Sequence, residues 1–138
     1  MPTHPCRECR REVSDQAASC PGCGAPFPAR PRWDGFGFEY KSGLSVAGLP
    51  LLHVSFKYRP NRVPVVARGW IAIGQFAVGG LTISQFGIGV VSVSQFTIAG
   101  FALAQFGIAW SLVAQFGAFL HDGRGQMVFD VLRLVGMR

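Results

Sequence analysis

Hydrophobic and polar positions repeat every five residues over the middle of the chain. From Gly69 the sequence divides into ten pentads: GWIAI, GQFAV, GGLTI, SQFGI, GVVSV, SQFTI, AGFAL, AQFGI, AWSLV and AQFGA. The first position is always Gly, Ala or Ser, the fourth is nearly always small, and the third and fifth are nearly always large and apolar. Self-similarity at a fixed short period is typical of a solenoid, so residues 69–120 are predicted to form a β-solenoid.

The pentad pattern also predicts which side chains face inward and which face outward. We expect the large third residue to fill the interior, with the small first residue beside it near a corner. The predicted solenoid core is Phe76, Leu81, Phe86, Val91, Phe96, Phe101, Phe106 and Phe116. The fifth residue would then line the exterior as an assembly surface, formed by Val78, Ile83, Ile88, Val93, Ile98, Leu103, Ile108 and Val113. A soluble monomer rarely exposes so large an uncharged surface, so something is expected to cover it.

The pentads resemble those of the pentapeptide-repeat proteins, which form a right-handed quadrilateral β-helix. That resemblance implies four pentads in each coil, while a flatter, two-sided coil of about ten residues is the alternative. With four pentads per coil, the Gln of alternate pentads would stack in two columns on opposite sides. Amides stacked about 4.8 Å apart can hydrogen-bond along the axis as a ladder. The predicted glutamine ladder is Gln75, Gln85, Gln95, Gln105 and Gln115.

Short elements are expected on both sides of the repeat. Residues 33–68 alternate apolar and polar positions between Gly and Pro, which indicates short strands leading into the solenoid. In residues 121–138 a turn is expected before a short amphipathic helix, because apolar residues from Val128 to Val135 recur at helical spacing. This helix would cap the last coil or dock on a neighbour. The predicted fold is therefore mainly β.

Three segments outside and at the start of the repeat carry a second resemblance. FEYKS (Phe38–Ser42), GLPLLHV (Gly48–Val54) and GWIAIG (Gly69–Gly74) are similar to segments of an uncharacterised bacterial family whose members continue into a long array of such repeats. This resemblance covers residues 33–138. It supports a repeat architecture and implies no activity.

All four cysteines lie near the N-terminus, in two C-x-x-C pairs separated by ten residues. Two such pairs supply a tetrahedral set of thiolates, so residues 1–25 are predicted to form a zinc ribbon around a structural Zn²⁺. The ligands would be Cys6, Cys9, Cys20 and Cys23, while His4 is surplus to the set. The segment resembles the N-terminal zinc ribbon of many bacterial proteins. Residues 26–32, rich in proline, are predicted to be a stiff linker.

Charge is absent from the repeat. The chain has a net charge of +6, but between Gly69 and Leu120 there is no Asp, Glu, Lys or Arg. Two membrane-spanning helices of about 20 residues would fit this length. Glutamines ten residues apart would wind around all faces of a helix, however, and the many β-branched residues favour strands. Met1–Arg11 lacks the apolar segment of a secretory signal, so a cytoplasmic protein is expected, with membrane association as the alternative.

These features indicate a structural protein rather than an enzyme. The sequence has no Gly-rich phosphate loop between a strand and a helix, and no recognisable pair of acids. Nucleic acid is not favoured as a partner, because the N-terminal arginines have only Trp33 as an accompanying aromatic residue. We expect the chain to self-associate through its solenoid into filaments or higher oligomers, with the zinc ribbon as adaptor for a protein partner. The alternative is a membrane-associated scaffold with the repeat on or in lipid.

Overall fold

The computed structural model describes residues 2–137 and divides them into two compact units. The first contains residues 2–36 and Arg59–Arg62, and the second contains Gly37–Tyr58 and residues 63–137. Met1 and Arg138, the first residue of the predicted ribbon and the last of the predicted helix, lie outside the described residues. The chain is mainly β, as predicted.

The first unit is built around the cysteines. Strand β1 (Thr3–Pro5) pairs antiparallel with β2 (Glu12–Ser14), and His4 lies opposite Val13. A small core of Cys6, Val13, Cys20 and Ala25 is buried beside this hairpin. So small a core cannot hold a fold by apolar burial alone, which is why a metal ion would contribute folding free energy here.

The second unit begins with a three-stranded sheet in the order β3-β6-β7. Strand β3 spans Phe36–Lys41, β6 spans Leu52–Tyr58 and β7 spans Ala67–Asp130. Strand β6 pairs in parallel with the first residues of β7, with Leu52 opposite Ile71. Between β3 and β6, β4 (Ser45–Val46) and β5 (Leu49–Pro50) form a hairpin whose turn residues both have positive φ. This two-residue turn fits the right-handed twist of the strands.

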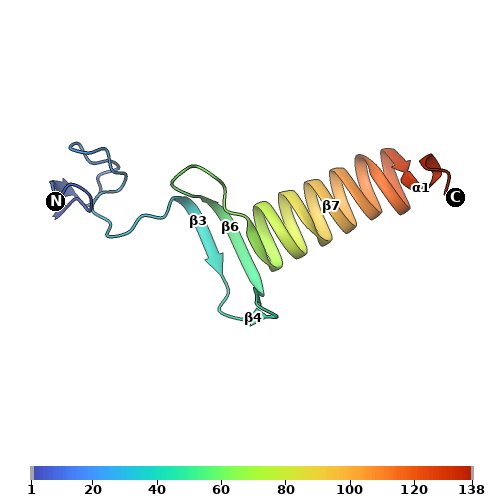
Figure 1. Ribbon diagram of the computed structural model, residues 1–138, viewed down its shortest axis with the longest axis horizontal. Coiled ribbons are helices and arrows are strands. Elements are labelled where there is room, and N and C mark those ends of the chain that lie inside the picture. The colour runs from blue at the N-terminus through green and yellow to red at the C-terminus, as the bar shows by residue number, and fades with distance from the viewer. Residues whose placement is uncertain (1, 138) are drawn as a thin grey trace. The chain divides into compact units, whose positions relative to one another are not determined.

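Strand β7 winds through successive coils (Figure 1). The ring of Phe86 stacks on Phe76 and on Phe96, with centroids 5.0 Å apart in both pairs. The Oγ1 of Thr82 donates a hydrogen bond of 2.9 Å to the Oγ of Ser92. Residues ten apart are therefore neighbours on adjacent coils, at the spacing of paired strands. The coil of four pentads implied by the pentapeptide-repeat resemblance was wrong, and the two-sided coil of ten residues describes the chain.

The interior of these coils contains small side chains. Within each coil the first and fourth residues of each pentad point inward; among them, the side chains buried most completely are Ala72, Ala77, Thr82, Ser92, Ala109 and Leu112. The predicted core was wrong. Its members Phe86, Val91, Phe96, Phe101, Phe106 and Phe116 are 40% to 56% exposed, and Phe76 and Leu81 are half-buried.

The flatness of the coil explains this reversal. A Cβ atom added at Gly87 would lie 2.6 Å from the Oγ of Ser92 on the opposite side of the interior, which is closer than atoms can approach. The two inner faces are thus already in contact through Gly, Ala, Ser and Thr. A phenyl ring does not fit between them, and the large apolar residues can only point outward.

The end of the chain also differs from the prediction. Residues 121–130, expected to contain a turn, continue β7 as far as Asp130. Helix α1 spans only Val131–Leu134, and the carboxylate of Asp130 accepts hydrogen bonds from the amides of Leu132 and Arg133 at its N-terminus. Glycine at position 136, with φ of 74°, ends this single turn.

Candidate metal centre and apolar exterior

The two C-x-x-C segments adopt the same backbone conformation. The carbonyl of Cys6 accepts a hydrogen bond of 2.9 Å from the amide of Arg10, and the carbonyl of Cys20 accepts one of 2.8 Å from Gly24. Arg10 and Gly24 occupy equivalent positions and both have left-handed φ, 60° and 75°. Each segment is therefore a tight knuckle that directs both of its sulfur atoms to one point.

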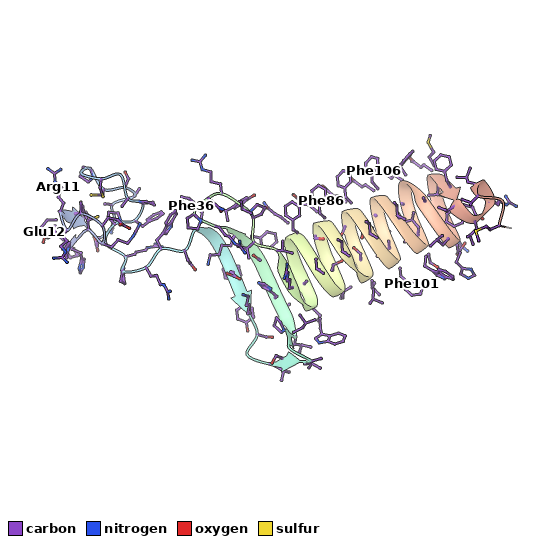
Figure 2. The ribbon with its side chains drawn as sticks, in the orientation of Figure 1. Arg11, Glu12, Phe36, Phe86, Phe101 and Phe106 are labelled. Atoms are coloured by element: carbon purple, nitrogen blue, oxygen red, sulfur yellow. The ribbon has the colours of Figure 1, made fainter. Side chains whose placement is uncertain are left out.

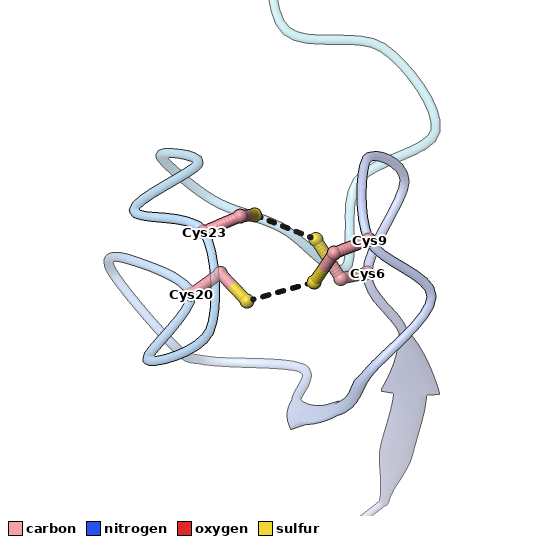
Figure 3. Close-up of side chains that lie close together, drawn as sticks. All are labelled: Cys6, Cys9, Cys20 and Cys23. Carbon is pink, nitrogen blue, oxygen red and sulfur yellow. Dashed lines mark hydrogen bonds between the residues drawn. The ribbon is translucent and has the colours of Figure 1, made fainter.

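The four sulfur atoms converge between these knuckles (Figure 3). The Sγ of Cys6 lies 3.7 Å from that of Cys23, and the Sγ of Cys9 lies 3.5 Å from that of Cys20. All four lie within 4.8 Å of one another. Thiolates at about 2.3 Å from a tetrahedral ion are about 3.8 Å apart. The four predicted ligands are thus brought together with a spacing that a metal ion fits.

Backbone amides favour the thiolate form of Cys6 and Cys20, whereas at Cys23 the amide of Ala25 is outweighed by burial and the three neighbouring sulfur atoms, which raise the pKa to about 12. The amide of Cys9 lowers the pKa of Cys6. Burial raises the pKa of Cys20, but the amides of Cys23 and Gly22 outweigh burial and lower it to about 6. Thiolates are the form in which cysteine ligates a metal. His4 lies exposed on β1 and is not part of the cluster.

The proline-rich segment after the cysteines packs against the ribbon instead of standing free as the predicted linker. The guanidinium of Arg7 donates hydrogen bonds to the carbonyls of Pro26 and Phe27, at 2.8 and 3.0 Å. The amide of Arg7 donates to the carbonyl of Pro28, which is fully buried. The ring of Trp33 lies 5.9 Å from the same guanidinium. The cysteine unit therefore extends beyond the 25 residues that the spacing predicted.

Large apolar side chains cover both faces of β7. All residues of the predicted assembly surface, from Val78 to Val113, are exposed. The phenylalanines that were predicted to be buried, apart from the half-buried Phe76, are exposed as well. Figure 2 shows Phe86 and Phe106 pointing out from one side of β7 and Phe101 from the other. The exterior is thus apolar on both faces, apart from the column of glutamines from Gln75 to Gln115, whereas the interior holds alanine, glycine and hydroxyl side chains.

A groove runs along one of these faces from coil to coil. Its walls are the stacked phenylalanines from Phe76 to Phe116 and a parallel column of aliphatic side chains from Val78 to Ile108. The residues between them, including Gly87 and Thr97, form its floor. The volume is about 760 Å³, and the groove crosses five successive coils. It therefore runs parallel to the axis around which β7 winds.

The glutamines form one column rather than two. Each directly precedes a phenylalanine of the stacked column, so Gln75 to Gln115 occupy the same corner of five consecutive coils. Their side chains are exposed, apart from the half-buried Gln75. Among residues 2–137, no hydrogen bond joins one of these amides to another, so the predicted ladder is not formed within the chain.

A buried polar network lies beside the first coil. His53 is almost completely buried, and its Nδ1 accepts a hydrogen bond of 2.8 Å from the amide of Arg68. Its Nε2 therefore carries the proton and donates to Glu39, 3.2 Å away. Glu39 also contacts the ammonium groups of Lys41 and Lys57, at 3.0 and 3.3 Å. Burial raises the pKa of Glu39, but Lys41 and Lys57 outweigh it and hold the pKa below its usual value. The network ties β3, β6 and β7 together, and both nitrogens of the histidine are occupied.

Within residues 2–137, no helix combines the length and the apolar character needed to cross a membrane. No protein-family model, curated protein or solved structure matches the chain. The two family resemblances drawn from the sequence therefore stay predictions.

Proposed function

We propose that this chain is a non-enzymatic membrane scaffold, with the β-solenoid of β7 in lipid and a zinc ribbon in water as an adaptor. The observation that supports the proposal is the inverted distribution of side chains in β7. Phenylalanine, isoleucine and valine face outward, while alanine, glycine, serine and threonine face inward. Water disfavours such an arrangement, since burial of large apolar side chains normally stabilises a fold. Hydrocarbon as the surrounding solvent favours it.

The hydroxyl groups of the interior support the same proposal. Ser92 accepts from Thr82 at 2.9 Å and lies 2.8 Å from the Oγ of Ser94, which in turn lies 2.9 Å from Ser84. The hydroxyl of Thr97 donates to the carbonyl of Gly87 at 3.0 Å. These hydroxyl groups therefore find their hydrogen-bond partners within the interior of the coils, without water. A strand wound against itself also pairs its backbone from coil to coil, as a segment in lipid must.

The cysteine unit would hold a structural zinc ion. Four thiolates close a tetrahedral site and leave no position for a catalytic water molecule. Zinc would fix a small polar module, with exposed arginines at positions 10 and 11, at the membrane surface. We propose a protein partner for this module.

Lateral self-association is a second candidate function, and the glutamine column favours it. The five amides lie in a row on an otherwise apolar exterior and have no partner among residues 2–137. In lipid, such amides are stabilised by hydrogen bonds to a second copy. End-to-end stacking into filaments is less favoured, because β6 already pairs with the first coil of β7. Two copies would therefore associate side by side.

Flotation tests the membrane proposal. The purified full-length chain, refolded with phosphatidylcholine vesicles, is placed below a sucrose gradient and centrifuged. We expect it to float with the lipid after alkaline carbonate treatment, because the apolar exterior is inserted. A matched Cys6→Ser and Cys20→Ser double variant should float equally, since the repeat and not the ribbon binds lipid. Protein that stays monomeric at the bottom of the gradient would contradict the proposal, and sedimenting aggregates would indicate association without lipid.

A further inference from the structure

Resting on the proposed membrane function, we infer that β7 spans the bilayer with its coil axis along the membrane normal. The acyl chains of both leaflets are then the partner of its exterior. Three features of β7 carry this inference: the height of its charge-free region, the side chains at the two ends of that region, and the direction of its groove.

The charge-free region has the height of a bilayer core. Residues 69–120 contain no charged side chain and wind with ten residues per coil, which gives about five coils. With a rise of about 4.8 Å per coil, the uncharged region is about 25 Å high. The hydrocarbon core of a bilayer is about 30 Å thick. Arg68 precedes this region and Asp122 follows it, so charge begins immediately at both ends.

Tryptophan marks both ends of the same column. Trp70 and Trp110 lie four coils apart, and both are about half exposed. The indole of Trp70 donates to the carbonyl of Val46, while Trp110 stacks on His121. Each therefore has an apolar body on the exterior and a polar neighbour toward the charged end. Tryptophan prefers this setting at the two membrane–water interfaces.

Other orientations of the coil place charged side chains in hydrocarbon or apolar side chains in water. A coil lying on the membrane needs one polar face, but Phe86 and Phe101 point outward on opposite faces (Figure 2). A coil lying within the bilayer plane would place Arg68 and Asp122 in hydrocarbon. The groove between Phe76 and Phe116 runs along the coil axis, and acyl chains lie along the membrane normal. Chains and groove are parallel only when the coil axis is normal to the bilayer.

Depth-dependent fluorescence quenching tests the orientation. Three single-tryptophan versions of the full chain place the indole in one column at three heights: Trp70 alone, Trp110 alone, and Val90→Trp with phenylalanine at 33, 70 and 110. Each is refolded into phosphatidylcholine vesicles whose acyl chains are brominated either near the carbonyl or near the chain end. We expect tryptophan at 90 to lose most fluorescence to the deep bromines, and Trp70 and Trp110 to lose most to the shallow ones.

The contrary outcomes separate the inference from the proposed function. Equal depths at all three positions would overturn the spanning orientation while leaving lipid binding intact. Absence of quenching at every position would overturn the membrane function as well.

Trypsin digestion of the unaltered chain in sealed vesicles gives a second test, since residues 69–123 contain no Lys or Arg. We expect trypsin outside the vesicle to remove either the region before the repeat or the region after it from each molecule, because the other region lies inside the vesicle until detergent opens it. Cleavage at both Arg68 and Arg124 from outside, with the repeat still bound, would overturn the inference.

Discussion

Val90 offers a substitution whose effect depends strongly on the solvent around β7. Its side chain is 63% exposed on the outside of the coil. It lies in the column of Trp70 and Trp110, two coils from each, which places it about 10 Å from the N-terminal end of the charge-free region and about 15 Å from the C-terminal end. We predict that Val90→Lys strongly destabilises the chain in lipid.

The magnitude follows from the position. A lysine at the centre of a bilayer costs about 2.5–3.5 kcal/mol. Its side chain can shorten the path to water by extending toward an interface, but about 10 Å exceeds its length, so most of the cost remains. In water, the same exposed substitution would change stability by no more than about 0.5 kcal/mol. The effects of Val90→Lys on the unfolding equilibrium constant in lipid and in water are thus expected to differ by roughly two orders of magnitude.

Reversible urea unfolding of the chain refolded into vesicles measures this difference. Met127→Lys is the matched control, because Met127 is 55% exposed in β7 but lies beyond Asp122 and Arg124, outside the charge-free region. We expect Val90→Lys to lose about 2.5 kcal/mol or more and Met127→Lys to stay within about 1 kcal/mol of the wild type. Equal effects of the two lysines would refute the argument that residue 90 lies in hydrocarbon.

Three further predictions concern the interior, the ribbon and the polar network. Ala102→Leu should cost about 1–3 kcal/mol by overfilling the flat interior, whereas Leu103→Ala, on the exposed side, should cost less in the same urea titration. Cys20→Ser should abolish stoichiometric zinc in the purified protein by mass spectrometry, and His4→Ala should retain it. Lys41 and Lys57 lower the pKa of Glu39 in the folded chain. The ionised carboxylate therefore stabilises the fold fully above the unfolded-state pKa of about 4.3, and this stabilisation is lost as the pH falls through the folded-state pKa. Glu39→Gln should therefore destabilise the chain at pH 7, and the difference should vanish in acid; a difference that persists in acid would contradict this.

The cluster of four cysteines could be predicted because its chemistry is local. Cys6 and Cys9 are close in sequence, as are Cys20 and Cys23, so each pair fixes its own knuckle and only two knuckles must meet. The contact of Arg7 with the following proline-rich segment carried no comparable signal. A single arginine among several has no distinguishing spacing, and its carbonyl partners are backbone atoms that any sequence provides.

Which side chains of the repeat point inward could not be predicted from the rule that water-soluble folds bury their large apolar side chains. That rule placed the largest apolar residue, such as Phe96, inside. The informative position was the fourth of each pentad, which is almost always small, as in Ala77 and Ser92. Together with the small first position, it leaves a flat interior in which only small side chains fit. The number of residues per coil then follows from the paired pentads, since every second one repeats the Gln-Phe pair.

The central claim is tested most directly by identifying the solvent that surrounds the phenylalanine rings. Solid-state NMR on the chain in bilayers can follow proton magnetisation as it spreads from acyl chains or from water into the protein. We predict that acyl-chain magnetisation reaches the rings of Phe86, Phe96 and Phe106 before it reaches the hydroxyl-bearing residues Thr82 and Ser92. Faster transfer to these rings from water than from the acyl chains would contradict the account.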